Sequence, residues 1–141
     1  MNKIKELVYE GLGFPIIIKN ANVLEFRGEI LPKVDHAELE KKVFEILVEQ
    51  KQKMTGAQMQ FVRGFMKKSQ KEFSKDLGFS SHTTISSWEK TGNKATGMSP
   101  SVELAVRLLM SDYLSNPEMV TDNFKDILRG LEEPHGCIRV A

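Results

Sequence analysis

Residues 69–89 read SQKEFSKDLGFSSHTTISSWE, and this stretch decides which fold the sequence predicts. Ser69 is a typical helix N-cap, and Phe73 and Leu77 lie four residues apart, on one helical face. Gly78 follows where a helix usually ends. A second helix comes directly afterwards, with Ser80 or Ser81 as its cap. Two short helices joined by a tight turn can be a packed helix pair only, or the two helices of a DNA-binding helix-turn-helix.

The second helix of this pair, residues 81–90, has one apolar and one polar face. Ile85 and Trp88 are three residues apart and are expected in the core. The opposite face carries short polar side chains, which can approach base edges in the major groove without pushing the helix outward. We therefore expect base contacts from Ser81, His82, Thr83, Thr84 and Ser87.

Charge is unevenly distributed along the chain. Residues 51–100 hold nine Lys/Arg and three Asp/Glu, a net +6, whereas residues 1–50 (seven against nine) and 101–141 (four against seven) carry −2 and −3, so the whole chain carries +1. A basic segment can be an ordinary solvated face, but here it coincides with the helix pair. The residues expected to contact DNA phosphates are Ser69, Gln70, Lys67, Lys68, Lys71, Lys90 and Lys94.

The rest of the sequence predicts a small β segment followed by helices. Residues 1–34 predict a β-hairpin or short meander, with residues 16–18 as a strand and residues 19–22 as a turn. Further helices are expected after the caps Asp35, Thr55 and Ser99 and from Asn116. The helix after Asp35 should bury a stripe of Leu39, Val43, Leu47 and Val48, and the helix after Ser99 a stripe of Leu104, Leu108 and Leu109. The tail after Gly130 is expected to be loose. The predicted domains are residues 1–53 for dimerisation or partner binding, 54–115 for DNA binding, and 116–141 as a C-terminal helix and tail.

Several function classes lack support in the sequence. The single cysteine, Cys137, and three histidines without metal-ligand spacing predict no metal site, and we expect no cofactor. No Ser/His/Asp order, HExxH motif or Gly-rich phosphate loop indicates an enzyme. The apolar run at residues 14–18 is too short to span a bilayer, and the N-terminus alternates Lys and Glu unlike a signal peptide. These features predict a cytoplasmic protein that is not an enzyme.

The motifs FVRGF, SQKEFSKDLGFS and TISSWE resemble the Xre family of phage-repressor-like helix-turn-helix proteins. The resemblance implies a mainly α fold, a phage-repressor-like helix-turn-helix bundle with a small N-terminal β-hairpin. It also implies a homodimer that binds a palindromic double-stranded DNA operator and represses transcription. Matched by position, Arg63 and Glu89 would form a structural salt bridge between the first helix and the end of the recognition helix.

The chain departs from the Xre pattern at two positions. Seven steps separate Gly78 from Ile85, where the family usually has six, which leaves open whether Ser81, His82 or Thr83 first meets a base. Lys68 stands where the family often has a buried leucine. The wider chain is similar to helix-turn-helix antitoxins of the MqsA kind but lacks the cysteines of their zinc-binding domain. The alternative function is therefore an antitoxin-type module that binds a partner toxin through residues 1–50.

Overall fold

The computed structural model describes residues 2–141 and divides them into two compact units. Unit 1 contains residues 2–43 and 136–141, and unit 2 contains residues 44–135. The chain leaves unit 1 inside a helix after Val43 and returns to it after His135. Unit 1 is therefore assembled from two segments that are far apart in the sequence, and unit 2 is a continuous insertion between them.

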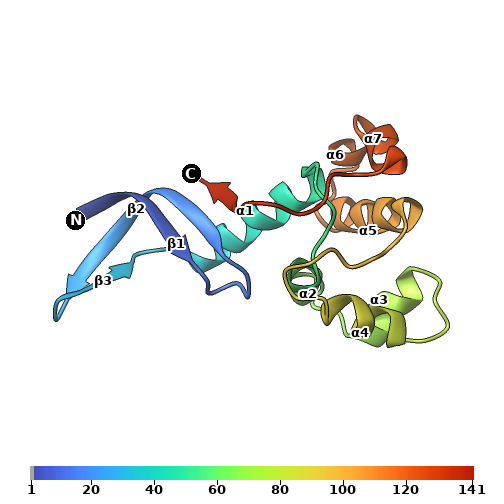
Figure 1. Cartoon of the computed structure of the whole chain (residues 1–141), viewed down its shortest axis with the longest axis horizontal. Helices are drawn as coiled ribbons and strands as arrows, with labels where there is room; N and C mark the ends of the chain where they lie inside the picture. The colour runs from blue at the N-terminus through green and yellow to red at the C-terminus, as the bar shows by residue number, and fades with distance from the viewer. Residues whose placement is uncertain (1) are drawn as a thin grey trace. The chain divides into compact units, whose positions relative to one another are not determined.

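Unit 1 is built on a mixed four-stranded sheet (Figure 1). Strands β1 (Asn2–Tyr9), β2 (Ile16–Phe26) and β3 (Glu29–Pro32) form an antiparallel meander. β4 (Ile138–Val140) pairs in parallel with residues 16–18 of β2. Because β1 pairs along most of β2, β3 and β4 share its other edge, one at each end.

The predicted turn at residues 19–22 is wrong, because β2 runs through it without interruption. Asn20 takes a left-handed conformation, with φ of 52°, inside the strand. The alternation of buried side chains therefore shifts by one, from Ile16 and Ile18 to Ala21 and Val23. The polar character of this stretch reflects exposed strand positions.

The loose tail predicted after Gly130 is replaced by ordered segments. Residues 138–140 form β4, and Glu132 pairs with Gln52 in an isolated parallel bridge. Lys53 Nζ also makes an ion pair of 2.6 Å with Glu133. A three-residue strand has no local signal in the sequence, since it exists only because the edge of β2 offers it hydrogen-bonding partners.

Helix α1 (His36–Glu49) begins where the sequence predicts. The Asp35 carboxylate accepts a hydrogen bond from the Glu38 N–H at 3.1 Å, which satisfies a helix N-terminal donor. The predicted apolar stripe of α1 is buried, at Leu39, Val43, Leu47 and Val48. Residues of α1 up to Val43 belong to unit 1, and those from Phe44 onward belong to unit 2.

Unit 2 is helical. Its further helices are α2 (Gly56–Phe65), α3 (Gln70–Asp76), α4 (Thr83–Glu89), α5 (Pro100–Tyr113), α6 (Glu118–Thr121) and α7 (Phe124–Arg129). The predicted caps Thr55, Ser69 and Ser99 are confirmed, since each side chain accepts a backbone hydrogen bond from the residue three positions later. The single helix predicted from Asn116 is instead α6 and α7, separated at residues 122–123.

The apolar stripe predicted for α5 is wrong. Leu108 is 44 % exposed, whereas Val106 and Met110 are fully buried together with the charged Glu103 and Arg107. The helix is therefore rotated relative to the prediction. Two ionic residues take core positions because they satisfy backbone groups of the segment that precedes α2.

The predicted fold class, a mainly α bundle of the phage-repressor type with a small hairpin, is wrong. Residues 2–141 form seven helices and a four-stranded mixed sheet, and β4 near the end of the chain contributes to that sheet. The fold is α and β, with the sheet confined to unit 1 and with helices α2 to α7 confined to unit 2.

Candidate nucleic-acid interface

Helix α4 packs against both α2 and α3 through a small aromatic and aliphatic core (Figure 1). Ile85 and Trp88 of α4 are buried, and so is Phe73 of α3. The rings of Phe79 and Trp88 meet edge to face, with centroids 5.7 Å apart. This packing fixes the apolar face of α4 inward and leaves its other face to solvent.

The turn between α3 and α4 is held by local and non-local hydrogen bonds. Gly78 has φ of 77°, the left-handed conformation expected one residue past a helix end, and its N–H donates to the Lys75 carbonyl. The hydroxyl of the buried Ser74 donates to the Ser81 carbonyl at 2.6 Å. This bond connects α3 directly to the residue at the far end of the turn.

The second helix of the pair starts later than predicted. α4 begins at Thr83, so Ser80 and Ser81 lie in the turn and His82 is the N-cap without a side-chain capping bond. Ser81 Oγ accepts a hydrogen bond from the Thr83 N–H only two residues on, as in a serine turn, and its carbonyl is already bonded to Ser74. The hydroxyl therefore ends the turn and does not cap the helix.

The five residues predicted to contact bases are exposed, but they come from two kinds of backbone. Thr83, Thr84 and Ser87 lie on α4, whereas Ser81 and His82 lie before it. At 1.5 Å per residue the seven residues of α4 span about 10 Å, which fits within the width of a B-DNA major groove. The extra residue between Gly78 and Ile85 is thus accommodated in the turn.

Arg63 and Glu89 form the ion pair that the resemblance implies. Arg63 Nε and Nη2 donate to the two carboxylate oxygens of Glu89 at 2.8 and 2.9 Å, a bidentate arrangement. The hydrogen bond that Arg63 donates to Glu89 raises the pKa of Arg63. Arg63 Nη1 also donates to the Lys68 carbonyl at 3.0 Å. One guanidinium thereby connects α2, the turn before α3, and the end of α4.

Some of the backbone N–H groups at the start of α3 are hydrogen-bonded to side chains of the same segment. Ser69 and Glu72 form a reciprocal capping box, in which each side chain accepts from the backbone N–H of the other at 3.1 Å. The Ser69 N–H is the main reason that the pKa of Glu72 is lowered. The N–H groups of Gln70 and Lys71 lie between these two and are left for an acceptor outside the helix.

Two residues predicted to contact phosphates have partners inside the protein. Gln70 Nε2 donates to Glu89 at 3.4 Å, and Lys68 Nζ is ion-paired with Asp76 of α3. Both side chains therefore stabilise the packing of α3. The other predicted lysines, Lys67, Lys71, Lys90 and Lys94, are exposed.

The surface around the helix pair keeps a clear positive charge. Within residues 67–94, the lysines that are exposed and take part in none of the ion pairs are Lys67, Lys71, Lys75, Lys90 and Lys94. Lys75 is an addition to the predicted set. The three acidic residues of residues 51–100 are neutralised by Arg63 and Lys68 or engaged in the capping box. Apart from the exposed carboxylate of Glu72, the charges of this segment that have no ionic partner are therefore cationic.

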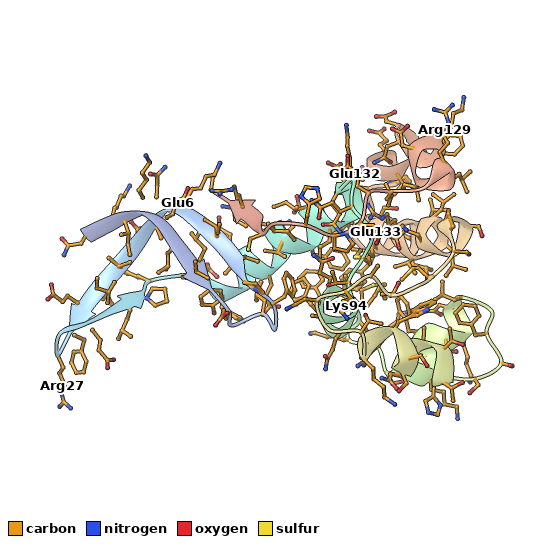
Figure 2. The ribbon with its side chains drawn as sticks, in the orientation of Figure 1. Glu6, Arg27, Lys94, Arg129, Glu132 and Glu133 are labelled. Atoms are coloured by element: carbon orange, nitrogen blue, oxygen red, sulfur yellow. The ribbon has the colours of Figure 1, made fainter. Side chains whose placement is uncertain are left out.

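The loop after α4 is anchored on the start of α2, which sequence reasoning missed. The N–H groups of Gly56 and Ala57 donate to the carbonyls of Lys94 and Gly92 at 3.2 and 2.9 Å. A Cβ on Gly56 would lie 2.4 Å from the Trp88 carbonyl oxygen, so only glycine fits there. In Figure 2, Lys94 lies beside the start of α2. The loop thus presents Lys90 and Lys94 on a fixed backbone.

No known protein family, no curated protein and no solved structure matches this chain. In the part that the structure describes, residues 2–141, no group of three or more His, Cys, Asp and Glu side chains could hold a metal ion. No helix there has the length and apolar character needed to cross a bilayer.

Proposed function

We propose that the chain is a sequence-specific DNA-binding transcriptional regulator that reads the major groove with α4. The single observation that carries this proposal is the coincidence of two features on one helix pair. The exposed face of α4 offers short hydroxyl side chains, Thr83, Thr84 and Ser87. Exposed, unpaired lysines lie on the adjoining segments of the chain: on α3, on the α2–α3 turn and on the loop after α4.

The two sets of side chains have different roles in this proposal. Hydroxyls on a helix that enters the groove can donate to and accept from base edges, which discriminates between sequences. Lysines contact phosphates, which positions the protein and makes the affinity depend on salt. Ser81 and His82 precede α4 and would contact the DNA only at the entrance of the helix into the groove. The Arg63–Glu89 pair holds α4 against α2 and needs no contact with DNA.

The proposal extends to a homodimer that represses its own operon at a palindromic operator. A single helix of seven residues contacts few base pairs, so two copies on neighbouring half-sites would supply the specificity of a repressor. The sheet of unit 1 then serves association, as the next subsection argues. The resemblance to the Xre family supports this reading through its motifs and is not needed for the electrostatic argument.

The test is selection of binding sequences from a random double-stranded oligonucleotide pool, followed by gel shift at about 100 mM salt. We expect an enriched, two-fold symmetric sequence that binds at least tenfold more tightly than random duplex. Equal affinity for all duplexes, or no affinity, would contradict sequence-specific reading. DNA from upstream of the protein's own gene is the first single sequence to try.

A second candidate function is the binding of a partner protein through residues 1–50, as an antitoxin binds its toxin. It is favoured by the exposed apolar side chains of β2 and β3. Co-expression and pull-down with the product of a neighbouring gene tests it. DNA binding by α4 is compatible with such a partner, whereas the homodimer contact proposed in the next subsection would compete with it for the same side chains of β2 and β3.

A further inference from the structure

The hairpin formed by the ends of β2 and β3 concentrates exposed apolar side chains. Four of the nine large hydrophobic residues that are exposed in the described part of the chain lie here: Leu24, Phe26, Ile30 and Leu31, with exposed fractions of 41–59 %. Among the described residues, 2–141, β1 pairs with β2 as far as Val23, and only β2 and β3 pair beyond that point. A two-stranded hairpin that exposes its apolar side chains is marginal without a further surface to pack against.

The register of the hairpin gathers three of these residues on one face. Leu24 is directly opposite Leu31, and Phe26 is two positions further along β2, which places it on the same side of the sheet. Glu29 is opposite Phe26 and so belongs to this side too. We call this surface the hairpin face. It consists of Leu24, Phe26, Glu29 and Leu31, with Arg27 at its end.

Arg27 adopts a left-handed backbone conformation in which other residue types are preferred. Arg27 and Gly28 have φ of 50° and 79°, as in a two-residue hairpin turn in which asparagine or glycine is preferred at the first position. The guanidinium of Arg27 lies over the ring of Phe26 at 5.1 Å, so its charge stays beside the apolar residues. Figure 2 places Arg27 at the free end of the hairpin. The turn by itself gives no reason for an arginine.

We propose that a second copy of this chain packs on the hairpin face, with a two-fold axis between the two hairpins. The face has a centre of three apolar side chains and, at its margin, one cation and one anion. A two-fold axis brings Arg27 of each copy toward Glu29 of the other, so the surface is complementary to itself. A partner with charge of one sign would meet repulsion from one of the two residues.

This interface deepens the proposed function, since it would supply the dimer that a palindromic operator requires. The association itself does not rest on DNA binding, because every contact involved lies within residues 24–31 of unit 1. The two proposals can therefore fail separately. Association is measured without DNA, and DNA binding by a monomeric variant can still be measured on a single half-site.

The experiment is sedimentation equilibrium of the full chain and of a charge-exchange series. We expect Arg27→Glu and Glu29→Arg each to raise the dimer dissociation constant at least about tenfold, because each places like charges opposite one another. The double variant Arg27→Glu with Glu29→Arg should return to within about threefold of the original, since it restores an opposite pair across the axis. If Arg27 and Glu29 interacted only within one hairpin, the single variants would change the stability of the monomer and would not change the dimer dissociation constant.

Two further variants separate association from folding. Arg27→Asn suits the turn better, so it should keep or raise the melting temperature while weakening the dimer. Leu108→Ser removes an exposed apolar side chain of unit 2 and should leave the dimer unchanged. A wild-type chain that stays monomeric at its highest soluble concentration would overturn the proposal, as would a dimer that Arg27→Glu does not weaken. A monomer that binds an unlike protein through Phe26 would also overturn it, in favour of a foreign partner.

Discussion

Arg107 and Glu103, one turn apart on α5, form a buried ion pair of 2.9 Å in the core of unit 2. Arg107 also donates to the carbonyls of Val48 and Gln52 at 3.2 and 2.7 Å, and Glu103 accepts from the Met54 N–H at 2.9 Å. The pair therefore satisfies backbone groups in the last turn of α1 and in the segment between α1 and α2. Burial lowers the pKa of Arg107, and Glu103 partly offsets this effect.

Replacing one member of this pair should destabilise the protein strongly. Arg107→Met leaves Glu103 charged and buried and frees several carbonyls, and we expect a loss of about 3–5 kcal/mol in the free energy of unfolding. Urea denaturation measures this. Arg129→Met, at an exposed arginine that ends α7, is the matched control and should change stability by less than about 0.5 kcal/mol. Equal small effects of the two variants would contradict the structural role of Arg107.

The contact between Gly56 and the end of α4 predicts opposite effects for two glycines of α2. Gly56→Ala forces a Cβ against the Trp88 carbonyl and should cost about 1–3 kcal/mol. Gly64→Ala faces open space in the same helix and should stabilise by about 0.5–1 kcal/mol, since alanine favours the helix. Thermal unfolding of both variants tests the pair. A tolerated Gly56→Ala would mean that the loop after α4 is not anchored on α2.

The lowered pKa of Glu72 predicts a dependence of stability on pH. Because the folded pKa lies below the unfolded value, the stabilisation is present above the unfolded pKa and is lost as the pH falls through the folded pKa. Glu72→Gln should therefore be less stable than the wild type at neutral pH, and the difference should shrink in acid. Titration of the Glu72 carboxyl by NMR should give a midpoint below that of an ordinary glutamate. The Ser69→Ala variant keeps the backbone N–H of residue 69 but loses the side-chain hydrogen bond to Glu72. The midpoint should therefore move part of the way back up.

A phosphate contact of Lys71 would affect all DNA sequences alike. Lys71→Ala should weaken specific and random duplexes by a similar factor and reduce the slope of log affinity against log salt by about one. Lys3→Ala, at an exposed lysine of unit 1, should leave the slope unchanged. Fluorescence anisotropy at several salt concentrations measures both. A slope that Lys71→Ala does not alter would remove Lys71 from the interface.

A base contact of Thr84 would affect only the selected sequence. Thr84→Ala should lower affinity for the selected operator by roughly tenfold and leave affinity for random duplex nearly unchanged, because one base pair is no longer discriminated. Ser86→Ala, at a half-buried position of the same helix, is the control and should keep the specificity ratio. A uniform loss on all duplexes would indicate that Thr84 contacts the backbone.

Elements whose signals are local could be predicted from the amino-acid sequence alone. The caps Asp35, Thr55 and Ser69 each bond to a backbone group three residues away, so a short stretch contains everything required. The apolar faces of α1 and α4 were predictable for the same reason, because their periodicity is visible within two or three turns. The net charge of residues 51–100 also needs no structure.

Features that depend on contacts between separate elements could not be predicted from a local pattern. β4 forms because the edge of β2, more than one hundred residues earlier, is unpaired at Ile16–Ile18. Arg107 is buried because it meets carbonyls of a segment before α2, so α5 turns a charged face inward and exposes Leu108. α4 starts at Thr83 because Ser74 holds the Ser81 carbonyl across the turn. For β4 and Arg107 the stabilising partner is remote in the sequence, and for α4 it lies across a turn in the neighbouring helix, so the periodicity of a single element does not reveal it.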